Sequence, residues 1–271
     1  MTPALVVEKK AAVAAAQAAR ILGMRIDCTS YADACERIVE WARGKRGVTV
    51  CAANVHMVME GYDNPAFRRI VNSADLVTPD GMPLVWGLRR LGFPGASRVY
   101  GPDLTLAVLE AAEQARLPIA FYGGSPVALA GLKDRIARQW PELRVACAIS
   151  PPFRALTAEE DQQYCEELRR SGARLIFVGL GCPKQERWMH ERRDQIGAVL
   201  LGVGAAFDFL AGAKPQAPRW MMRSGLEWLF RLVSEPARLW RRYLILNPRF
   251  VALFAMQLLL GRVPPAEEQK N

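Results

Sequence analysis

The sequence lacks the residue patterns by which metal and redox sites are usually recognised. It has only two histidines, which lie far apart, and no D-x-D triplet of the kind that clamps a metal–sugar diphosphate complex. None of its six cysteines forms a C-x-x-C pair. The spacing therefore gives no zinc site and no thioredoxin-like motif. Scattered thiols, several of them in apolar runs, are more typical of a reduced cytosolic protein than of a disulfide framework.

Long apolar runs are also missing. The apolar stretch at residues 250–260 has 11 residues, whereas a membrane-spanning helix needs about 20. Residues 1–20 contain alanines and lysines without the continuous apolar core of a secretory signal. We therefore expect residues 1–22 to be a flexible leader and the chain to have no spanning helix.

The sequence does contain short apolar runs that alternate with helical segments. Runs such as Val48–Ala53 and Leu175–Val178 have the length of buried strands, and each leads through a turn into a helical pattern. Over residues 23–212 this alternation predicts an α/β fold, a doubly wound, Rossmann-like parallel sheet with helices on both faces. Ligands of such sheets bind beyond the carboxyl ends of the strands. The polar and glycine residues expected at those ends are Asn54, Asp80, Gly123, Gly124, Gln185 and Asp208.

The turn after Leu175–Val178 is the most informative of these strand ends. It contains Gly179 and Gly181, then Pro183 and a predicted helix that begins with polar residues. A glycine turn before a helix N-terminus points backbone N–H groups at a ligand, which suits a phosphate or a nucleotide sugar. The turn lacks the third glycine and the following acid of a dinucleotide-binding fingerprint. An ordinary strand–helix turn is the alternative.

Residues 213–271 differ in composition from the rest of the chain. Between residues 219 and 262, eight arginines accompany only two glutamates, a net charge of +6. Tryptophans and leucines interleave with these arginines at helical spacings, which predicts a basic amphipathic helical appendage that binds an anionic membrane surface. The alternative is a helical subdomain packed on the sheet. Because the aromatic residues form no stacking platform, we do not expect a nucleic acid partner.

Asp80 is the candidate catalytic carboxylate. It follows a brief predicted strand and lies between a proline and a glycine. A carboxylate on such an edge can act as a general base toward an acceptor hydroxyl, or it can close an Asx turn or cap the next helix. Without a metal clamp, arginines and helix N-termini would have to hold the charge of a leaving diphosphate.

Three other polar residues also have two interpretations each. Asn54 can line a pocket or cap the helix after its strand. Gln185 can contact a ligand or fill the third position of a helix cap. Arg98 can bind substrate or form a surface ion pair.

Several motifs, in this order along the chain, resemble the WecG/TagA/CpsF family of glycosyltransferases. In the sheet region they are Thr78-Pro79-Asp80-Gly81-Met82-Pro83, Arg98-Val99-Tyr100-Gly101-Pro102-Asp103, Phe121-Tyr122-Gly123-Gly124, Gly179-Leu180-Gly181-Cys182-Pro183-Lys184-Gln185-Glu186 and Gly202-Val203-Gly204-Ala205-Ala206-Phe207-Asp208. In the tail they are Ala217-Pro218-Arg219-Trp220, Gly225-Leu226-Glu227-Trp228, Arg231-Leu232 and Glu235-Pro236-Ala237-Arg238-Leu239. The resemblance covers residues 24–261.

The resemblance implies an inverting, metal-independent transfer of a hexose, with no cofactor besides the sugar donor. The donor would be a UDP-sugar and the acceptor a polyprenyl-diphosphate-linked saccharide, used in surface polysaccharide or cell-wall polymer synthesis. The enzyme would be peripheral on the cytoplasmic face of the cell membrane. A homo-oligomer is left open, and a non-enzymatic basic protein that binds anionic lipid is the alternative function.

The resemblance also assigns residues to roles. The catalytic set is Asp80, Arg98 and Gln185, and the substrate-binding set is Asn54, Gly123, Gly124, Gly181, Asp208, Arg231, Arg238 and Arg241. No residue is assigned to a metal. One position departs from the family pattern, because Ala52 stands where members often carry a threonine. The missing hydroxyl bears on the donor sugar, which in this family is N-acetylmannosamine, its uronic acid or glucose.

Overall fold

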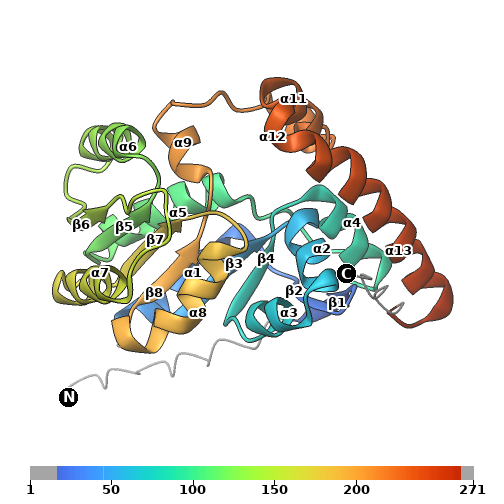
Figure 1. Cartoon of the computed structure of the whole chain (residues 1–271), viewed down its shortest axis with the longest axis horizontal. Helices are drawn as coiled ribbons and strands as arrows, with labels where there is room; N and C mark the ends of the chain where they lie inside the picture. Colours follow the sequence, from blue (N-terminus) through green and yellow to red (C-terminus); the bar gives the residue numbers. More distant parts are fainter. Residues whose placement is uncertain (1–16, 45, 264–271) are drawn as a thin grey trace, which may run out of the picture.

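A six-stranded parallel sheet forms the centre of the molecule (Figure 1). The computed structural model describes residues 17–44 and 46–263. The strand order is β4-β3-β8-β7-β5-β6, and each neighbouring pair is parallel. The strands are β3 (Val48–Ala53), β4 (Leu76–Pro79), β5 (Ile119–Gly123), β6 (Val145–Ile149), β7 (Leu175–Gly179) and β8 (Val199–Gly202). The predicted α/β class is confirmed.

Helices cover both faces of this sheet, so the doubly wound arrangement is confirmed as well. One face carries α1 (Tyr31–Arg43), α5 (Gly101–Gln114), α6 (Pro126–Gln139) and α9 (Ala206–Leu210). The other carries α2 (Val55–Asp63), α3 (Pro65–Asn72), α4 (Met82–Arg90), α7 (Ala158–Arg170) and α8 (Lys184–Ile196). Successive residues of β7 alternate between the two cores, with Leu175 and Phe177 in one and Ile176 and Val178 in the other. Burial on both faces explains why the strands read as continuous apolar runs.

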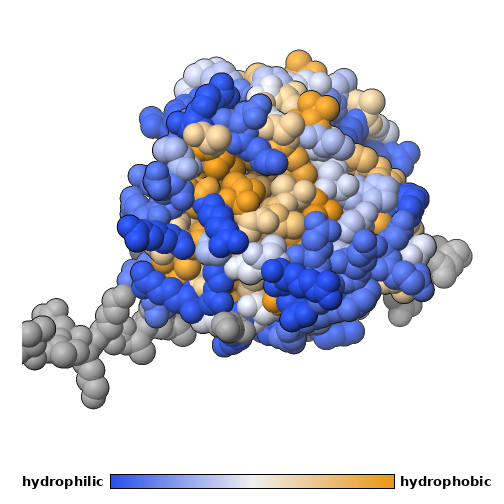
Figure 2. All heavy atoms as spheres, turned by 90° about the vertical axis from the view of Figure 1, so that its left-hand side faces the viewer, coloured by the Kyte–Doolittle hydropathy of each residue, from blue (hydrophilic) through white to orange (hydrophobic). Residues whose placement is uncertain are grey.

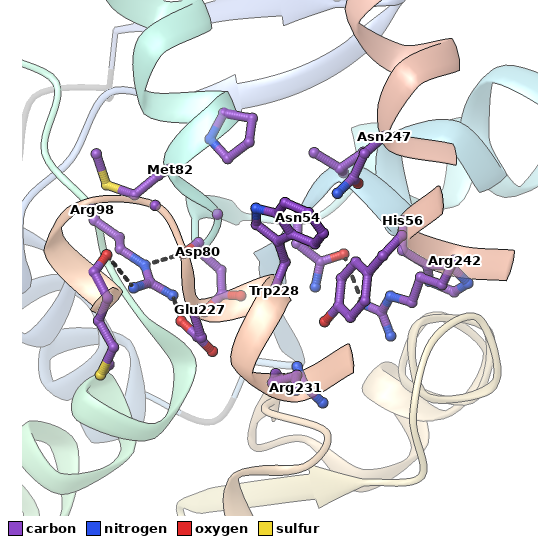
Figure 3. Close-up of a pocket in the computed structure, with 16 residues that line it drawn as sticks. Asn54, His56, Asp80, Met82, Arg98, Glu227, Trp228, Arg231, Arg242 and Asn247 are labelled. Atoms are coloured by element: carbon purple, nitrogen blue, oxygen red, sulfur yellow. Dashed lines mark hydrogen bonds and ion pairs between the residues drawn. The ribbon is translucent and has the colours of Figure 1, made fainter. Parts of the chain in front are cut away.

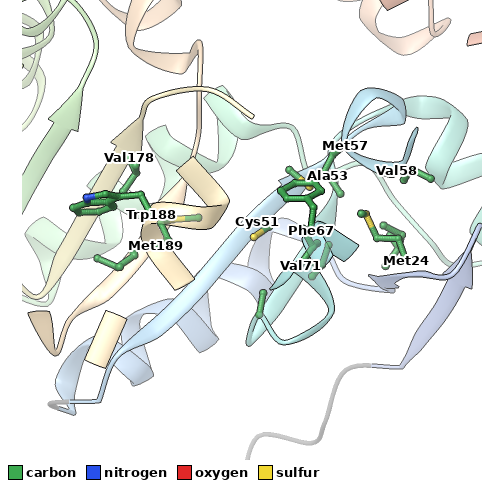
Figure 4. Close-up of a cluster of buried hydrophobic side chains, with 14 of the residues drawn as sticks. Met24, Cys51, Ala53, Met57, Val58, Phe67, Val71, Val178, Trp188 and Met189 are labelled. Carbon is green, nitrogen blue, oxygen red and sulfur yellow. The ribbon is translucent and has the colours of Figure 1, made fainter. Parts of the chain in front are cut away.

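The two hydrophobic cores are held by large side chains from the helices. Figure 4 shows Trp188 and Met189 of α8 and Phe67 of α3 in the core beneath α2 and α8. Trp188 stacks on Tyr122 of β5 with ring centroids 4.2 Å apart.

All six cysteines are unpaired, as the sequence predicted.

A β-hairpin precedes α1 and corrects the predicted leader. Strands β1 (Ala18–Ile21) and β2 (Met24–Asp27) pair antiparallel, and Leu22 at the turn is fully buried. The backbone N–H of Leu22 donates to the side-chain oxygen of Gln257 at 2.8 Å. The prediction of a flexible segment through residue 22 is therefore wrong for residues 18–22. Residues 1–16 of that predicted leader lie outside the described part of the chain.

The tail forms short helices followed by one long helix. After α10 (Arg219–Arg223) and α11 (Glu227–Ser234), a continuous helix of 25 residues runs from Pro236 to Leu260. It consists of α12 (Pro236–Trp240), a π-helical turn η1 (Arg241–Ile245) and α13 (Leu246–Leu260). By length and composition this helix could cross a membrane, which the prediction based on residues 250–260 alone did not anticipate. One side of it packs along α2 (Figure 1), where Arg249 forms an ion pair with Asp63 at 2.6 Å.

The far edge of the sheet is formed by β6, between α6 and α7. Figure 2 views this side, where hydrophobic residues gather in the middle of a hydrophilic surface. Residues 145–148 of β6 are half-buried. A homo-oligomer, which the sequence left open, is not tested by this single chain.

Candidate active site

Two adjoining cavities open at the carboxyl ends of β3, β4 and β8. The chain leaves β3 into α2 on one face of the sheet and leaves β8 into α9 on the other, which opens a crevice between the two strands. The cavity over the glycine turns, here the loop cavity, spans about 820 Å³ with the space that is open to solvent included, and it is lined by Ala52, Asn54, Met57, Asp80, Tyr100, Gly101, Pro102, Gly181, Cys182, Gln185, Gly202, Val203, Gly204, Ala205, Ala206, Phe209, Arg231, Arg238 and Arg242. The cavity under the tail, here the tail cavity, spans about 600 Å³ on the same measure and is lined by Asn54, Val55, His56, Asp80, Gly81, Met82, Pro83, Arg98, Met222, Gly225, Glu227, Trp228, Arg231, Arg242, Tyr243 and Asn247.

Asp80 lies where the two cavities meet. It borders both, as do Asn54, Arg231 and Arg242. One carboxylate oxygen of Asp80 accepts a hydrogen bond of 2.7 Å from the backbone N–H of Gly101, the first residue of α5. Desolvation raises the pKa of Asp80 to about 6, although the nearby Arg98 guanidinium opposes this shift. The carboxyl group thus holds the start of α5 and is also placed and tuned to accept a proton near neutral pH.

Arg98 joins Asp80 to the tail (Figure 3). Its Nε donates to the main-chain oxygen of Asp80, and its Nη2 donates to the carboxylate of Glu227 in α11, both at 2.5 Å. The Arg98 and Glu227 side chains are only 16% and 13% exposed, and the guanidinium lies over the Tyr100 ring, 4.2 Å from its centroid. The ion pair that the sequence left open exists, but it is enclosed in the site. It fixes α11 beside the candidate base.

Gln185 holds the two glycine turns together. Its side-chain oxygen accepts hydrogen bonds from the backbone N–H groups of Gly181 at 3.2 Å and Gly204 at 3.1 Å. Its amide nitrogen donates to Glu186 at 2.7 Å, and burial raises the pKa of Glu186 to about 7. The side chain of Gln185 is therefore engaged by protein groups on both ends, and its geometry is that of a positioning residue for the loop cavity.

Asn54 fulfils both roles that its sequence context allowed. Its side-chain oxygen caps α2 by accepting a hydrogen bond of 3.2 Å from the backbone N–H of Met57. The same oxygen accepts a hydrogen bond of 3.2 Å from Arg242 of the tail. A helix cap at the end of β3 thus also orients an arginine between the two cavities.

Comparison with known proteins identifies the family. The family described as "Glycosyl transferase WecG/TagA/CpsF family" matches residues 19–263. The chain is also 32% identical over 207 residues to an N-acetylglucosaminyldiphosphoundecaprenol N-acetyl-beta-D-mannosaminyltransferase of Bacillus spizizenii, over 76% of this chain and 78% of that protein. The chain belongs to the WecG/TagA/CpsF family of glycosyltransferases. It is an enzyme, and the non-enzymatic alternative is set aside.

Two of the three predicted tail arginines of this glycosyltransferase border the cavities. Arg231 borders both cavities and Arg238 borders the loop cavity. Arg241, however, is exposed, stacks on the Trp240 ring and borders neither cavity. Its neighbour Arg242 faces the site instead. A new helix, α12, begins at Pro236 after the end of α11, and Arg231 and Arg238 on either side of this break both border the loop cavity.

Three predicted substrate-binding residues of the glycosyltransferase lie outside the lining of both cavities. Gly123 and Gly124 adopt positive φ angles, and a Cβ atom at Gly123 would come within 2.6 Å of the Gly179 backbone. Gly123 thus serves close packing between β5 and β7, and Gly124 packs beside Phe207 of α9. Asp208 forms an ion pair with Lys214 at 3.0 Å, at the start of the tail. Of the predicted glycines, only Gly181 borders the loop cavity.

Sequence reasoning missed several residues of the glycosyltransferase site. His56 follows Asn54 by two residues and borders the tail cavity. Burial lowers the pKa of His56 to about 4, helped by Arg242, so the imidazole is neutral. Glu227 and Trp228 stood in a tail motif but were given no role. Only their shared motif could have indicated them, because nothing in the local pattern shows that the tail folds back over β4.

Proposed function

We propose that this glycosyltransferase moves N-acetylmannosamine from a UDP-sugar to a polyprenyl-diphosphate-linked saccharide at the cytoplasmic face of the cell membrane, in cell-wall polymer synthesis. The observation that carries this proposal is the place of Asp80 between two cavities. The name of the Bacillus spizizenii relative supports both the transferred sugar and a lipid-diphosphate acceptor.

In the proposed reaction the donor diphosphate lies in the loop cavity. Arg231, Arg238 and Arg242 border that space and can bind phosphate oxygens with charge-assisted hydrogen bonds. The acceptor sugar lies in the tail cavity, beside Trp228. Asp80 takes the proton of the acceptor hydroxyl as its oxygen attacks the anomeric carbon from the side opposite the departing diphosphate. That geometry inverts the anomeric configuration.

The long tail helix would place this site at the membrane. Apolar side chains lie exposed on its outer side, with Leu244 55%, Val251 63% and Leu258 42% exposed. Val251 and Leu258 are seven positions apart along α13 and so lie on one face of that helix. Phe250 and Gln257 precede them by one position, about 100° around the helix, and are buried against the protein. A helix held in this way would lie in the membrane interface rather than cross it.

Transfer can be tested with purified enzyme and a short-chain lipid diphosphate that carries N-acetylglucosamine. A panel of UDP-N-acetylmannosamine, the corresponding uronic acid and UDP-glucose identifies the donor. We expect UDP-N-acetylmannosamine to be used with the highest kcat/KM. If no UDP-sugar in the panel is consumed while the protein is folded, the proposed donor class is wrong.

Transfer is expected to persist in EDTA at unchanged kcat. The reason is that the sequence has no D-x-D triplet, and within residues 17–44 and 46–263 no group of three or more metal-ligating side chains is assembled. The charge of the leaving diphosphate would then fall to the arginines. A loss of turnover in chelator that Mn²⁺ or Mg²⁺ restores contradicts the metal-independent mechanism.

Transfer is also expected to fall as the pH drops through about 6. Asp80 must be ionised to accept a proton, and desolvation raises the pKa of its carboxyl group to about 6. Activity should therefore be high above this pH and decline tenfold per pH unit well below it. The measurement is kcat/KM from pH 5 to 8 with a soluble acceptor. A profile that stays flat to pH 5 means that a group other than Asp80 controls the proton transfer.

A further inference from the structure

Glu186 is a buried acidic residue that borders neither cavity. It lies in the first turn of α8 and is only 1% exposed, although a glutamate is almost never fully buried unless it is paired. Its Oε1 accepts the 2.7 Å hydrogen bond from the amide nitrogen of Gln185. Its Oε2 is buried and has no hydrogen-bond partner in the described ranges. Enclosing such a group is costly, so the position of Glu186 is not explained by stability alone.

The groups around Glu186 show what its contact with Gln185 requires. The Cys182 thiol faces it from the glycine turn, the Cys51 thiol from β3 and the Arg242 guanidinium from the tail. Burial raises the pKa of Glu186 to about 7. A proton on the unpartnered Oε2 would leave Oε1 able to accept from Gln185. The contact with Gln185 therefore needs an oxygen at this place rather than a charge.

Three glycines surround the Gln185 amide on its other sides. Its oxygen accepts hydrogen bonds from the backbone N–H groups of Gly181 and Gly204, in the turns that follow β7 and β8. A Cβ atom at Gly202 would come within 3.0 Å of its nitrogen. A reversed amide would direct its own N–H groups at two backbone N–H donors. The acceptor at Glu186 and the two donors thus specify the same orientation of the amide.

We propose that Glu186 is a positioning residue for sugar transfer, because its carboxyl oxygen fixes the Gln185 amide that holds the two glycine turns at the loop cavity. The proposal rests on the proposed function for the donor that these turns meet. Gly181 and Gly204 both border the loop cavity, so a shift of either turn changes the space that the donor diphosphate fills. The alternative is that Glu186 only stabilises the N-terminus of α8 by its negative charge.

The test compares Glu186→Leu with Glu186→Gln. Both substitutions remove the negative charge, but only Gln keeps an oxygen that can accept from Gln185. UDP is titrated into each protein by calorimetry, so no turnover is needed. Glu186→Leu should weaken UDP affinity by about 10-fold, the size of effect expected for a lost hydrogen bond in the buried site. Glu186→Gln should retain most of the affinity. Glu191→Leu, on the exposed side of α8, should bind UDP like the unmodified protein.

A double-mutant cycle shows whether Glu186 acts through Gln185. Gln185→Leu removes the amide, so the double variant Gln185→Leu/Glu186→Leu should bind UDP no more weakly than Gln185→Leu alone. Independent contributions to folding would instead add. The same dependence should appear in the kinetics, where Glu186→Leu raises KM for the UDP-sugar and leaves KM for a water-soluble acceptor unchanged.

Hydrogen exchange at the backbone N–H groups of Gly181 and Gly204 reports the positioning without any ligand. Both should exchange faster in Glu186→Leu than in Glu186→Gln. The proposal is wrong if Glu186→Leu protects these groups and binds UDP like the unmodified protein. It is also wrong if Glu186→Gln is impaired as much as Glu186→Leu, since the charge would then be what matters. Faster exchange in Glu186→Leu, with no UDP-sugar used by the unmodified enzyme, would support the positioning and contradict the proposed function.

Discussion

Asp80→Asn is expected to abolish most sugar transfer, with a fall in kcat of about 10²–10⁴-fold, the usual range for removing a general base. Asn retains an oxygen that can accept the 2.7 Å hydrogen bond from the backbone N–H of Gly101. The substitution therefore removes the proton acceptor and leaves the start of α5 supported. The measurement is single-turnover transfer at saturating donor and acceptor.

The same variant should not be less stable at neutral pH. Desolvation raises the pKa of Asp80 to about 6 in the folded protein, above its ordinary value. A carboxyl group with a raised pKa contributes stability at low pH and loses that contribution as the pH rises through the folded pKa. At pH 7.5 the ionised Asp80 therefore costs stability, and a neutral amide should leave the melting temperature unchanged or raised. Lost activity with a normal melting temperature separates catalysis from folding.

A matched control is Asp134→Asn, which makes the same chemical change on the exposed surface of α6. It should transfer sugar at the native rate. The residual activity of Asp80→Asn should also lose the inflection near pH 6. Near-native turnover by a folded Asp80→Asn enzyme would exclude Asp80 as the base and would leave the proposed chemistry without its proton acceptor.

The sheet was predictable from the sequence because its strands are buried on both faces. A run such as Leu175–Val178 can only be a strand or a buried helix segment, and the glycines that follow favour a strand. The β1 strand was not predictable in the same way. Its four residues include a single fully buried side chain, Ile21, and their pairing depends on β2 and on Gln257 from the other end of the chain.

The site was only half predictable, for a similar reason. Asn54, Asp80 and Gln185 follow strands, and the carboxyl ends of parallel strands meet at one edge of a sheet. Glu227 and Arg242 reach the same edge, where Glu227 pairs with Arg98, because the tail folds back, which no local pattern encodes. Gly123 and Gly124 also lie at the end of a strand, but glycine is required at these two positions by packing against β7 and α9. A strand-end position is thus neither required for a residue to border this site nor sufficient to show that it does.

Placing two glutamates on the outer face of α13 is expected to detach the enzyme from membranes. In Val251→Glu/Leu258→Glu, side chains that are 63% and 42% exposed become charged on the side away from the protein. Each apolar side chain of this size contributes about 1.5–3 kcal/mol when it is fully buried. Losing both should weaken binding to anionic vesicles by about 10²–10⁴-fold. Flotation with such vesicles measures the change.

A substitution is a sharper test here than removal of the tail. Phe254 approaches Gly87 of α4 closely, and Gln257 bonds the backbone of the β1–β2 hairpin at Leu22 and Arg20. Truncation would therefore uncover the core beneath the hairpin and remove Glu227 from Arg98. The matched control is Val127→Glu/Phe153→Glu, which changes two side chains that are 76% and 88% exposed on the sheet domain. It adds the same charge and should float with vesicles like the unmodified enzyme.

Transfer assays connect this surface to function. With a lipid-linked acceptor in vesicles, Val251→Glu/Leu258→Glu should transfer poorly, because the enzyme no longer reaches the membrane. With a water-soluble acceptor it should turn over normally, since the two residues line neither cavity. High salt should weaken the binding of the unmodified enzyme to anionic vesicles, because salt screens the contribution of about 1 kcal/mol from each basic residue near the surface and leaves the apolar contribution in place. An enzyme that resists both salt and alkaline extraction would instead have its long helix across the bilayer. The contacts of Arg249 with Asp63 and of Gln257 with the hairpin would then have to break in the membrane.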